Sequence, residues 1–419
     1  MTIYALQSAI GLIVLTGLAW GLSEERRFIS WRLTATGLGL QILIALILTK
    51  LPIAREALIS LNGLVDALMS ATNKGTSFVF GYVGGGAAPF EVANPQNVFV
   101  LGFQAIPLVL VISALSALLW YWRILPWVTR GFSLILQRSF NLGGAVGFGT
   151  AANVFLGMVE APLLVRPYMA RLTRSELFVL MTVGLATVAG TVIVLYAFVL
   201  SSILEGAMGQ VLTASLISLP AAVMVAKLMV PGAEDEQPTD GEVTPEDLGY
   251  QSSMDAITRG TLDGLALFLN IIAMLLVLVA LVALANILLG LLPDMFGAPL
   301  TMQRLFGWVF APLVWLMGIP WAEAATAGQL MGTKTVLNEF IAYIDLTNTP
   351  IEELSERSRL IMVYGLCGFA NFGSVGIMIG GMSAIVPERR EEITSLAMKA
   401  LVGGTLAAAM TGAVIGMIS

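Results

Sequence analysis

The chain has 419 residues, of which 57% are hydrophobic and 11% charged, and it carries a net charge of −6 with no histidine. Soluble domains are about 25% charged, and the apolar runs here are continuous rather than alternating, so we expect a polytopic α-helical membrane protein and not a transmembrane β-barrel. The lack of histidine excludes histidine proton relays, histidine metal sites and Ser-His-Asp catalysis, and the single cysteine, Cys367, excludes an intrachain disulfide.

The N-terminal part is predicted to contain three membrane spans, at 3–22, 33–51 and 98–122. Between the second and third spans, residues 54–72 mix charged side chains with Leu and Ile, which indicates an interfacial amphipathic helix. The glycine-rich stretch 73–95 that follows is expected to be loop-like.

Residues 141–170 are apolar but interrupted by glycines, and they follow a basic amphipathic surface helix at 123–140. Basic residues flank this stretch on both sides, with Arg138 before it and Arg166, Arg171 and Arg174 at or after its end. A single crossing would separate these charges across the bilayer, whereas a re-entrant hairpin leaves them on one face, as the positive-inside rule prefers. We therefore predict a re-entrant helical hairpin here.

The rest of the chain is predicted to add five spans and a second hairpin. The five spans are 176–204, 209–230, 263–292, 358–383 and 394–418. An acidic loop at 232–253 and a short polar helix near 254–262 precede the third of them. Residues 300–345, which are apolar but hold glycines, a proline and charged side chains, are expected to form the second hairpin.

Two of the spans are interrupted, 176–204 around residues 186–191 and 358–383 around residues 368–374. Each follows a hairpin and begins at an Arg-Ser pair. Three spans separate the two hairpins, and an odd number means that the second unit starts from the opposite membrane face. Paired broken helices in two inverted halves indicate a transporter with its site near the bilayer midplane.

The predicted organisation has four parts. Residues 1–122 are mainly scaffold, with three spans and one interfacial helix, and residues 123–204 are a first repeat unit of interfacial helix, hairpin and broken helix. Residues 205–299 contain connecting spans and the cytoplasmic acidic loop, and their span 263–292 belongs to the scaffold. Residues 300–419 are a second repeat unit of hairpin, broken helix and last span.

The basic residues predict the orientation. With the N-terminus outside, eight spans and two hairpins place 14 of the 21 Lys and Arg on the cytoplasmic side. These are Arg26, Arg27, Arg32, Arg123, Arg130, Arg138, Arg166, Arg171, Arg174, Lys227, Arg259, Arg389, Arg390 and Lys399. The inverse orientation would reverse that ratio, so both termini are expected to be extracytoplasmic.

Glu160 and Glu339 are the acidic residues at matching places in the two hairpins. An ionisable side chain at membrane depth faces protein or a water-filled cavity, and a carboxylate there suits a ligand rich in hydroxyl or amide groups. The alternative is pairing with a buried base such as Lys334. Glu323, also in the second hairpin, has no counterpart in the first and is interpreted as structural.

Short oxygen-bearing side chains lie beside both breaks. Asn153 and Thr187 could join freed backbone carbonyls in a cage for a small hard cation, or could be ordinary interhelical hydrogen bonders. Asn371 and Ser374 lie at the second break and suit a polar, neutral substrate. Phe369 either supplies a stacking face for a planar ring or belongs to the core.

Three segments together resemble the concentrative nucleoside transporter family. In chain order they are Gly157-x-x-Glu160-Ala161-Pro162-Leu163-Leu164 with Thr173-Arg174-Ser175-Glu176-Leu177, then Asn338-Glu339-Phe340-x-Ala342-Tyr343, then Cys367-Gly368-Phe369-Ala370-Asn371-Phe372. The resemblance extends from about residue 90 to the C-terminus, whereas the N-terminal spans match only in type.

The resemblance implies a homotrimer with a static scaffold and a moving transport domain, which takes up nucleosides with a coupling cation. For a bacterial member it implies the inner membrane, with both termini periplasmic. By position, sodium would bind Asn153, Thr187 and the carbonyl groups of Leu156 and Val188. The nucleobase would contact Gly157, Met158, Val159, Glu160 and Val192, and the ribose would contact Glu339, Asn371 and Ser374, with Phe369 beside it.

The chain departs from the family pattern where Gln-Thr-Glu follows the hairpin glycine, because it has Met158-Val159-Glu160. Loss of two base-facing hydrogen bonders predicts broader base tolerance or a different preferred nucleoside. The family uses sodium or protons. The oxygens of Asn153 and Thr187 favour sodium, since without histidine a proton would have to ride on a carboxylate.

The prediction is a cation-coupled nucleoside symporter and not an enzyme. One alternative is an inverted-repeat symporter for another small polar or anionic solute, which would require a buried arginine for an anion. A channel would show uncoupled, non-saturable flux, and an intramembrane enzyme would need a catalytic dyad at depth. No nucleic-acid-binding signature is present in the sequence.

Overall fold

The computed structural model describes residues 3–92, 98–232, 239, 248–295 and 297–419, and these contain helices but no β-strand longer than a single bridge. Seven helical stretches of the described residues are long and apolar enough to cross a membrane. They are Ile3–Gly21, Trp31–Lys50, Leu101–Tyr121, Arg174–Leu200, Ala207–Met229, Ser253–Leu289 and Pro387–Ile418. The broken pair α17 (Glu356–Leu366) and α18 (Phe372–Ile385) supplies the eighth predicted span.

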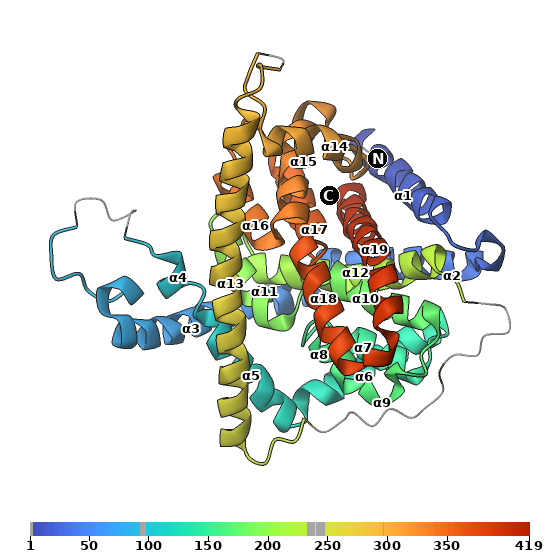
Figure 1. Cartoon of the computed structure of the whole chain (residues 1–419), viewed down its shortest axis with the longest axis horizontal. Coiled ribbons are helices and arrows are strands. Elements are labelled where there is room, and N and C mark those ends of the chain that lie inside the picture. The colour runs from blue at the N-terminus through green and yellow to red at the C-terminus, as the bar shows by residue number, and fades with distance from the viewer. Residues whose placement is uncertain (1–2, 93–97, 233–238, 240–247, 296) are drawn as a thin grey trace.

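The predicted interfacial helix is longer than expected. Helix α3 covers Pro52–Phe80, so residues 73–80, which we expected to be loop, are helical. The lone Gly75 in that stretch is tolerated. The helix ends only at Gly81, whose φ of +63° is disfavoured for other residues. Figure 1 shows α3 extending away from the main body on one side.

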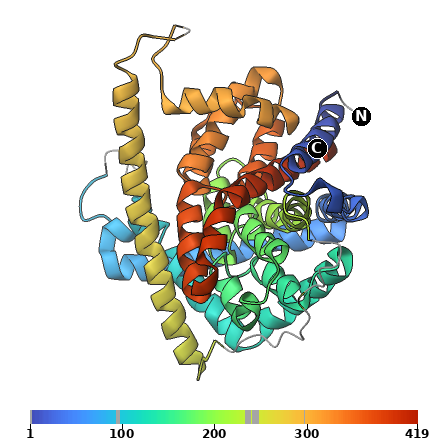
Figure 2. The same cartoon turned by 45° about the vertical axis from the view of Figure 1, so that its right-hand side comes forward.

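The polar helix predicted near 254–262 and the span predicted at 263–292 are one helix, α13 (Ser253–Leu289), which is capped at its start by Ser252. The polar start and the apolar remainder, which were predicted as separate elements, are thus continuous. Gly260 and Gly264 do not break the helix but allow close packing, since a Cβ on Gly260 would lie 2.7 Å from the Ser113 carbonyl oxygen of α5 (Leu108–Tyr121). Both views show α13 as a long column at the edge of the body (Figures 1 and 2).

The second hairpin begins later than predicted. Residues 300–345 contain α14 (Met302–Leu316), a bend of 116°, α15 (Trp321–Val336) and the start of α16 (Glu339–Asn348). Gly318, with a φ of +99°, and Pro320 cause the bend. The hairpin itself is therefore α15 with α16, and α14 is a separate helix before it.

The corrected boundaries make the two halves more alike. The first half has α6 (Ile124–Phe140), the hairpin of α7 (Gly144–Ala152), α8 (Glu160–Leu164) and α9 (Arg166–Met169), the broken pair α10 (Arg174–Ala186) and α11 (Gly190–Leu200), and the span α12 (Ala207–Met229). The second half has α14, the hairpin α15–α16, the broken pair α17–α18, and the span α19 (Arg390–Ile418). Each half is thus a surface helix, a hairpin, a broken helix and an unbroken span.

The two broken helices cross each other at their breaks. The backbone N–H of Phe369 donates to the Thr187 carbonyl oxygen at 3.3 Å. Gly368, with a φ of +136°, lies so close to α10 that a Cβ would be 2.6 Å from the Ala186 carbonyl oxygen. This crossing holds the ends of four half-helices together in the middle of the molecule.

The outer helices pack on different parts of this centre. Helix α1 (Ile3–Gly21) packs along α19, and α2 (Trp31–Lys50) packs along α12. Helices α5 and α13 pack mainly on each other. The first two spans therefore lie against the repeat units, while α5 and α13 form a separate pair.

Candidate functional site

A cavity of about 200 Å³ lies between the tips of the two hairpins, the two breaks and one face of α13. All nine residues predicted to contact substrate line it. They are Gly157, Met158, Val159, Glu160, Val192, Glu339, Phe369, Asn371 and Ser374. The fold thus brings together side chains that are more than 200 positions apart in the chain.

Glu339 is the first residue of α16 and is held by two neighbours. Tyr196 of α11 donates its hydroxyl to Oε1 at 2.5 Å, and Asn371 donates Nδ2 to Oε2 at 3.1 Å. Asn371 also caps α18, because its Oδ1 accepts from the Ser374 N–H at 2.7 Å. Lys334 does not bond the carboxylate directly, since its Nζ donates to the Gly365 carbonyl oxygen at 3.0 Å.

Glu160 is the first residue of α8 and is arranged differently. Its carboxylate contacts the backbone N–H groups of Val159 and of its own residue, and among the described residues no side chain bonds to it. Gly157 makes room for it, because a Cβ there would lie 2.7 Å from the Glu160 Oε2. Gly157 also has a φ of +140°, so this glycine shapes the hairpin tip.

The two apolar residues at the first hairpin tip pack on glycines of neighbouring helices. A Cβ on Gly184 of α10 would lie 2.9 Å from the Met158 Cβ. A Cβ on Gly381 of α18 would lie 2.6 Å from a methyl group of Val159. Both residues line the cavity, and neither offers a hydrogen-bonding group to a ligand.

The residues predicted to bind sodium lie beside this cavity. Asn153 Nδ2 donates to the Thr187 Oγ1 at 2.6 Å and to the Val183 carbonyl oxygen at 3.3 Å. Leu156 lines the cavity and Val188 is buried in the break of α10 and α11. The group offers amide, hydroxyl and carbonyl oxygens, the donor types that hard cations prefer.

Four polar residues on the cavity were not predicted. They are Thr191, Tyr196, Asn270 and Asn338. Among these four, Asn270 shows that a helix outside both repeats, α13, contributes a polar side chain to the cavity. A lone amide in the apolar stretch 264–285 was the available signal, since a polar side chain in a span usually faces protein or a cavity. Asn338 caps α16 by accepting from the Ile341 N–H at 2.9 Å.

Two other predictions concern residues near the site. Glu323 is structural as predicted, since its Oε2 accepts from the Ser355 N–H at 3.1 Å and from the Ser355 hydroxyl at 3.0 Å, next to the start of α17. The acidic loop lies mostly outside the described residues. One of its residues, Thr239, donates its N–H to the Glu176 carboxylate at 2.9 Å.

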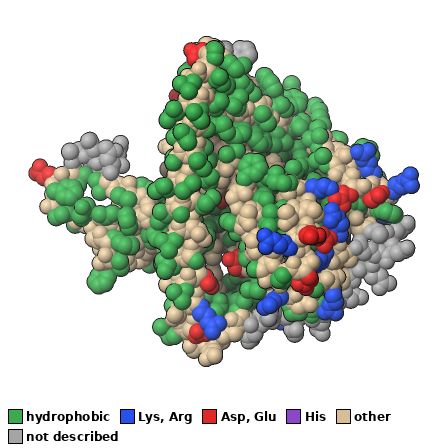
Figure 3. Space-filling model, viewed as in Figure 1, with side chains coloured by type: hydrophobic (Ala, Val, Ile, Leu, Met, Phe, Trp, Pro, Cys, Tyr) green, Lys and Arg blue, Asp and Glu red, His purple; other side chains and the backbone are tan. Residues whose placement is uncertain are grey.

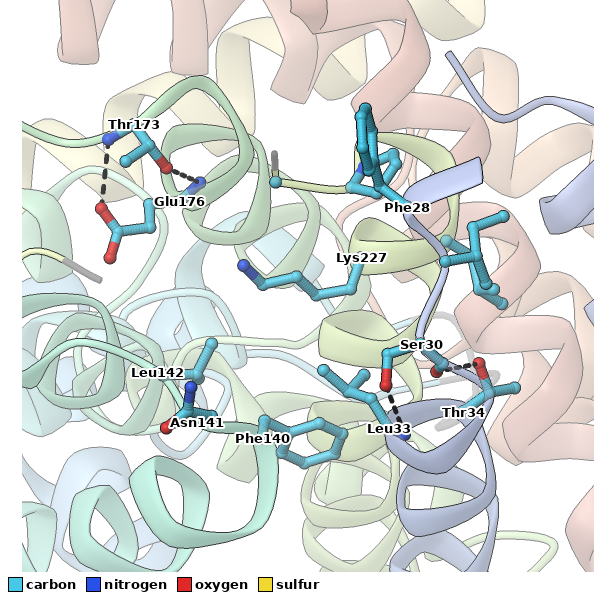
Figure 4. Close-up of a pocket in the computed structure, with 14 residues that line it drawn as sticks. Phe28, Ser30, Leu33, Thr34, Phe140, Asn141, Leu142, Thr173, Glu176 and Lys227 are labelled. Atoms are coloured by element: carbon cyan, nitrogen blue, oxygen red, sulfur yellow. Dashed lines mark hydrogen bonds between the residues drawn. The ribbon is translucent and has the colours of Figure 1, made fainter. Parts of the chain in front are cut away.

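A second cavity, of about 260 Å³, lies where α2 and α10 begin and α12 ends (Figure 4). Its polar groups are used in local contacts. Thr173 and Glu176 form a reciprocal cap on α10, Ser30 caps α2, and Lys227 donates to the Ser175 hydroxyl at 3.2 Å. None of the predicted site residues lines this cavity.

Comparison with known proteins decides the family. Models described as Na+ dependent nucleoside transporter N-terminus, nucleoside recognition, and Na+ dependent nucleoside transporter C-terminus match residues 10–83, 102–203 and 210–416. The nucleoside permease NupC of Helicobacter pylori is 32% identical, over 100% of this chain and 98% of that protein. This chain belongs to the concentrative nucleoside transporter family.

Further relatives agree. Rat sodium/nucleoside cotransporter 1 is 30% identical over 99% of this chain, which covers 64% of that longer protein. The structure of CNTnw in an inward-facing substrate-bound state matches with a TM-score of 0.89 at 32% identity, over 99% of this chain and 98% of that one. The concentrative nucleoside transporter family consists of transporters and not enzymes, and the protein is a multi-pass, all-α membrane transporter.

Proposed function

We propose that this protein is a sodium-coupled nucleoside symporter that works by alternating access. One observation carries the proposal: the carboxylates of Glu160 and Glu339, one from each inverted half, line a single cavity beside the Asn153–Thr187 pair. A site built from both halves can open to either face when the two repeat units shift together relative to a static scaffold.

The proposed roles follow the geometry. Glu339 and Asn371, held together at 3.1 Å, would accept and donate hydrogen bonds to the ribose hydroxyls, with Ser374 next to them. The tip of the first hairpin, from Gly157 to Glu160, with Val192, would face the base. Phe369 lines the cavity between these regions.

Sodium would bind between the first hairpin and the break of α10 and α11. Rotation of the Asn153 amide would turn its Oδ1 toward the ion, beside the Thr187 hydroxyl and the carbonyls of Leu156 and Val188. An ion held there would fix the first hairpin tip and so raise the affinity for the base, and by linkage the nucleoside would raise the affinity for the ion.

Uptake by proteoliposomes tests this function. The wild type is expected to accumulate nucleoside under an inward sodium gradient. Glu339→Gln and Asn153→Ala should each reduce uptake by at least about tenfold, as expected for loss of a hydrogen bond to a buried charged group or of an ion ligand. Glu352→Gln, an exposed carboxylate in the turn between α16 and α17 that does not line the cavity, is the matched control and should transport normally.

Several outcomes would contradict the proposal. Uptake driven by a pH gradient in the absence of sodium would show that the coupling ion is a proton and not sodium. Uptake that nucleosides fail to inhibit would favour a symporter for another solute. Flux that does not saturate would indicate a channel.

Met158 and Val159 predict broad base tolerance, because neither reads the edge of a base. The double variant Met158→Gln/Val159→Thr should narrow the range of competing nucleosides. Each hydrogen bond that a base makes with the new side chains should favour that base by about 1–3 kcal/mol of binding free energy over a base that leaves the side chain unpaired. Competition of uridine uptake by all common nucleosides measures this. If only uridine and cytidine compete in the wild type, the prediction is wrong.

For the domains, we propose that α5 and α13 form the scaffold next to the lipid and that the repeat units move. Since α1 and α2 pack on α19 and α12, they would move with the repeats, so that within residues 1–122 only the third span would belong to the static scaffold. Much of the described surface along α13 is apolar (Figure 3), as suits lipid or a neighbouring subunit. We further propose a homotrimer in a bacterial inner membrane with both termini periplasmic.

A further inference from the structure

Lys334 is a buried charged residue that the proposed transport cycle does not use. It lies in the last turn of α15 with no exposed surface and does not line the cavity. Its ammonium donates to the Gly365 carbonyl oxygen at 3.0 Å and interacts electrostatically with Glu339. A charge at this depth is costly, so its presence in a span-forming region points to a function.

The first half has a side chain in the equivalent place. Asn153 directly follows α7, the first arm of its hairpin, and donates to the Val183 carbonyl oxygen in the last turn of α10. Lys334, at the end of α15, donates to a carbonyl in the last turn of α17. In both halves, therefore, a side-chain nitrogen links the end of the first hairpin arm to the end of the first half of the broken helix.

The carboxylates are equivalent too. Glu160 is the first residue of α8 and Glu339 the first of α16, so each begins the second arm of its hairpin. Each half thus combines one carboxylate with the carbonyl-rich C-terminal end of a half-helix. The carboxylate carries a negative charge and the C-terminal end of the half-helix carries a partial negative charge, so both attract a cation.

The halves differ in where a positive charge comes from. In the second half the positive charge is the ammonium group of Lys334, which is part of the chain itself. In the first half the equivalent side chain, Asn153, is neutral, as is its partner Thr187, and no charged side chain bonds Glu160 among the described residues.

We propose that Lys334 is a tethered cation that takes, in the second half, the place that the transported cation takes in the first. It acts as a positioning residue: it joins α15 to α17 and keeps Glu339 negatively charged for the ligand. It follows that one coupling cation accompanies each nucleoside. This inference rests on the proposed cation coupling.

Nucleoside binding to purified protein at varied sodium concentration and constant ionic strength tests the proposal. For the wild type we expect the logarithm of the affinity to rise with the logarithm of sodium concentration with a slope of up to about one. Lys334→Asn, which places an amide as in the first half, should weaken binding at least about tenfold at low sodium. For this variant the slope of the logarithm of affinity against the logarithm of sodium concentration should approach about two, since a second sodium ion can bind in the place of the Lys334 ammonium.

Two further variants separate charge from fold. Lys334→Met removes the cation without supplying a ligand for another, and should lower both thermal stability and nucleoside affinity. The double variant Lys334→Met/Glu339→Gln leaves no uncompensated charge and should be more stable than Lys334→Met alone. Lys399→Gln removes a positive charge at the protein surface and should keep the wild-type slope.

A wild-type affinity and slope in Lys334→Asn would overturn the tethered-cation proposal. So would a double variant that is no more stable than Lys334→Met, including the case in which neither folds. If wild-type binding does not depend on any cation, the proposed coupling fails instead. The stability comparison between Lys334→Met and the double variant does not depend on sodium, so the two failures can be told apart.

Discussion

Glu160 and Glu339 begin the second arms of the two hairpins, yet their surroundings differ. Glu339 is bonded by Tyr196 and Asn371 and interacts with Lys334, whereas Glu160 is bonded by backbone N–H groups and, among the described residues, by no side chain. A bonded carboxylate has a fixed direction and suits a constant part of a ligand such as a ribose. A carboxylate held less tightly suits the part that varies among nucleosides.

A third carboxylate, Glu24, stabilises the fold outside the membrane spans. It lies between α1 and α2 and bonds Arg174, with Oε1 to Nη2 at 2.9 Å, and Lys399. The hydrogen bond from Arg174 is the main cause that lowers the pKa of Glu24 to about 2, with Lys399 adding to it. This cluster ties α10 and α19 to the loop after α1.

Glu24→Gln should destabilise the protein at neutral pH by about 1 kcal/mol, after allowance for partial exposure. A lowered pKa in the folded state contributes stability above the unfolded-state pKa, and this is lost as pH falls toward 2. The wild type should therefore lose stability relative to Glu24→Gln between about pH 4.5 and pH 2. Thermal unfolding in detergent over this range measures the difference, and parallel curves would count against the prediction.

At the scale of elements, the crossing of the two broken helices positions the site. Thr187 and Phe369 are joined through their backbones at this crossing, and both belong to predicted binding groups. The predicted ion-binding and substrate-binding groups are therefore joined directly by a backbone hydrogen bond. One backbone group freed by each break, the Thr187 carbonyl and the Phe369 N–H, is satisfied by the other break, which helps the broken helices to persist at membrane depth.

Gly368→Ala should disrupt this crossing. Its φ of +136° is strained for alanine, and the new Cβ would meet the Ala186 carbonyl oxygen at 2.6 Å. We expect a loss of about 2 kcal/mol or more in stability and loss of uptake. Gly376→Ala, in α18 with open space around it, is the matched control and should be neutral or slightly stabilising. Thermostability and proteoliposome uptake measure both, and equal behaviour of the two variants would exclude this role for the crossing.

At the scale of the whole molecule, charge and architecture support one orientation. Both chain ends lie toward the same end of the molecule, and α1 packs along α19 (Figure 1). In Figure 3 the basic side chains gather over the other end and one side of the face shown, while the upper part is mainly apolar. This distribution favours extracytoplasmic termini.

Cysteine labelling at the two ends of α19 tests the orientation. Cys367 is buried, so the native chain should give little background with a membrane-impermeant maleimide. In spheroplasts Ser419→Cys should be labelled, whereas Glu391→Cys should be labelled only after permeabilisation. Both positions are exposed in the structure. The reverse pattern would invert the topology.

The sequence by itself determined the type of fold, the two interrupted helices and the residues at both hairpin tips. Continuous apolar runs and polar groups within them are local signals, because hydrocarbon penalises each unsatisfied group where it occurs. For the same reason Glu160, Glu339 and Asn371 can be recognised from the sequence as candidate site residues. The element boundaries were less certain: the polar start of α13 was predicted as a separate helix, and α14 was predicted as part of a hairpin.

Only the tertiary structure decided which neighbours each group has. It placed Asn270 of α13 on the cavity, set Met158 and Val159 against glycines, and aimed Lys334 at Gly365 rather than at Glu339. These contacts join segments far apart in the chain, and their geometry depends on how helices cross. Sequence periodicity reports which face of a helix is apolar, but it carries no information about which helix meets that face.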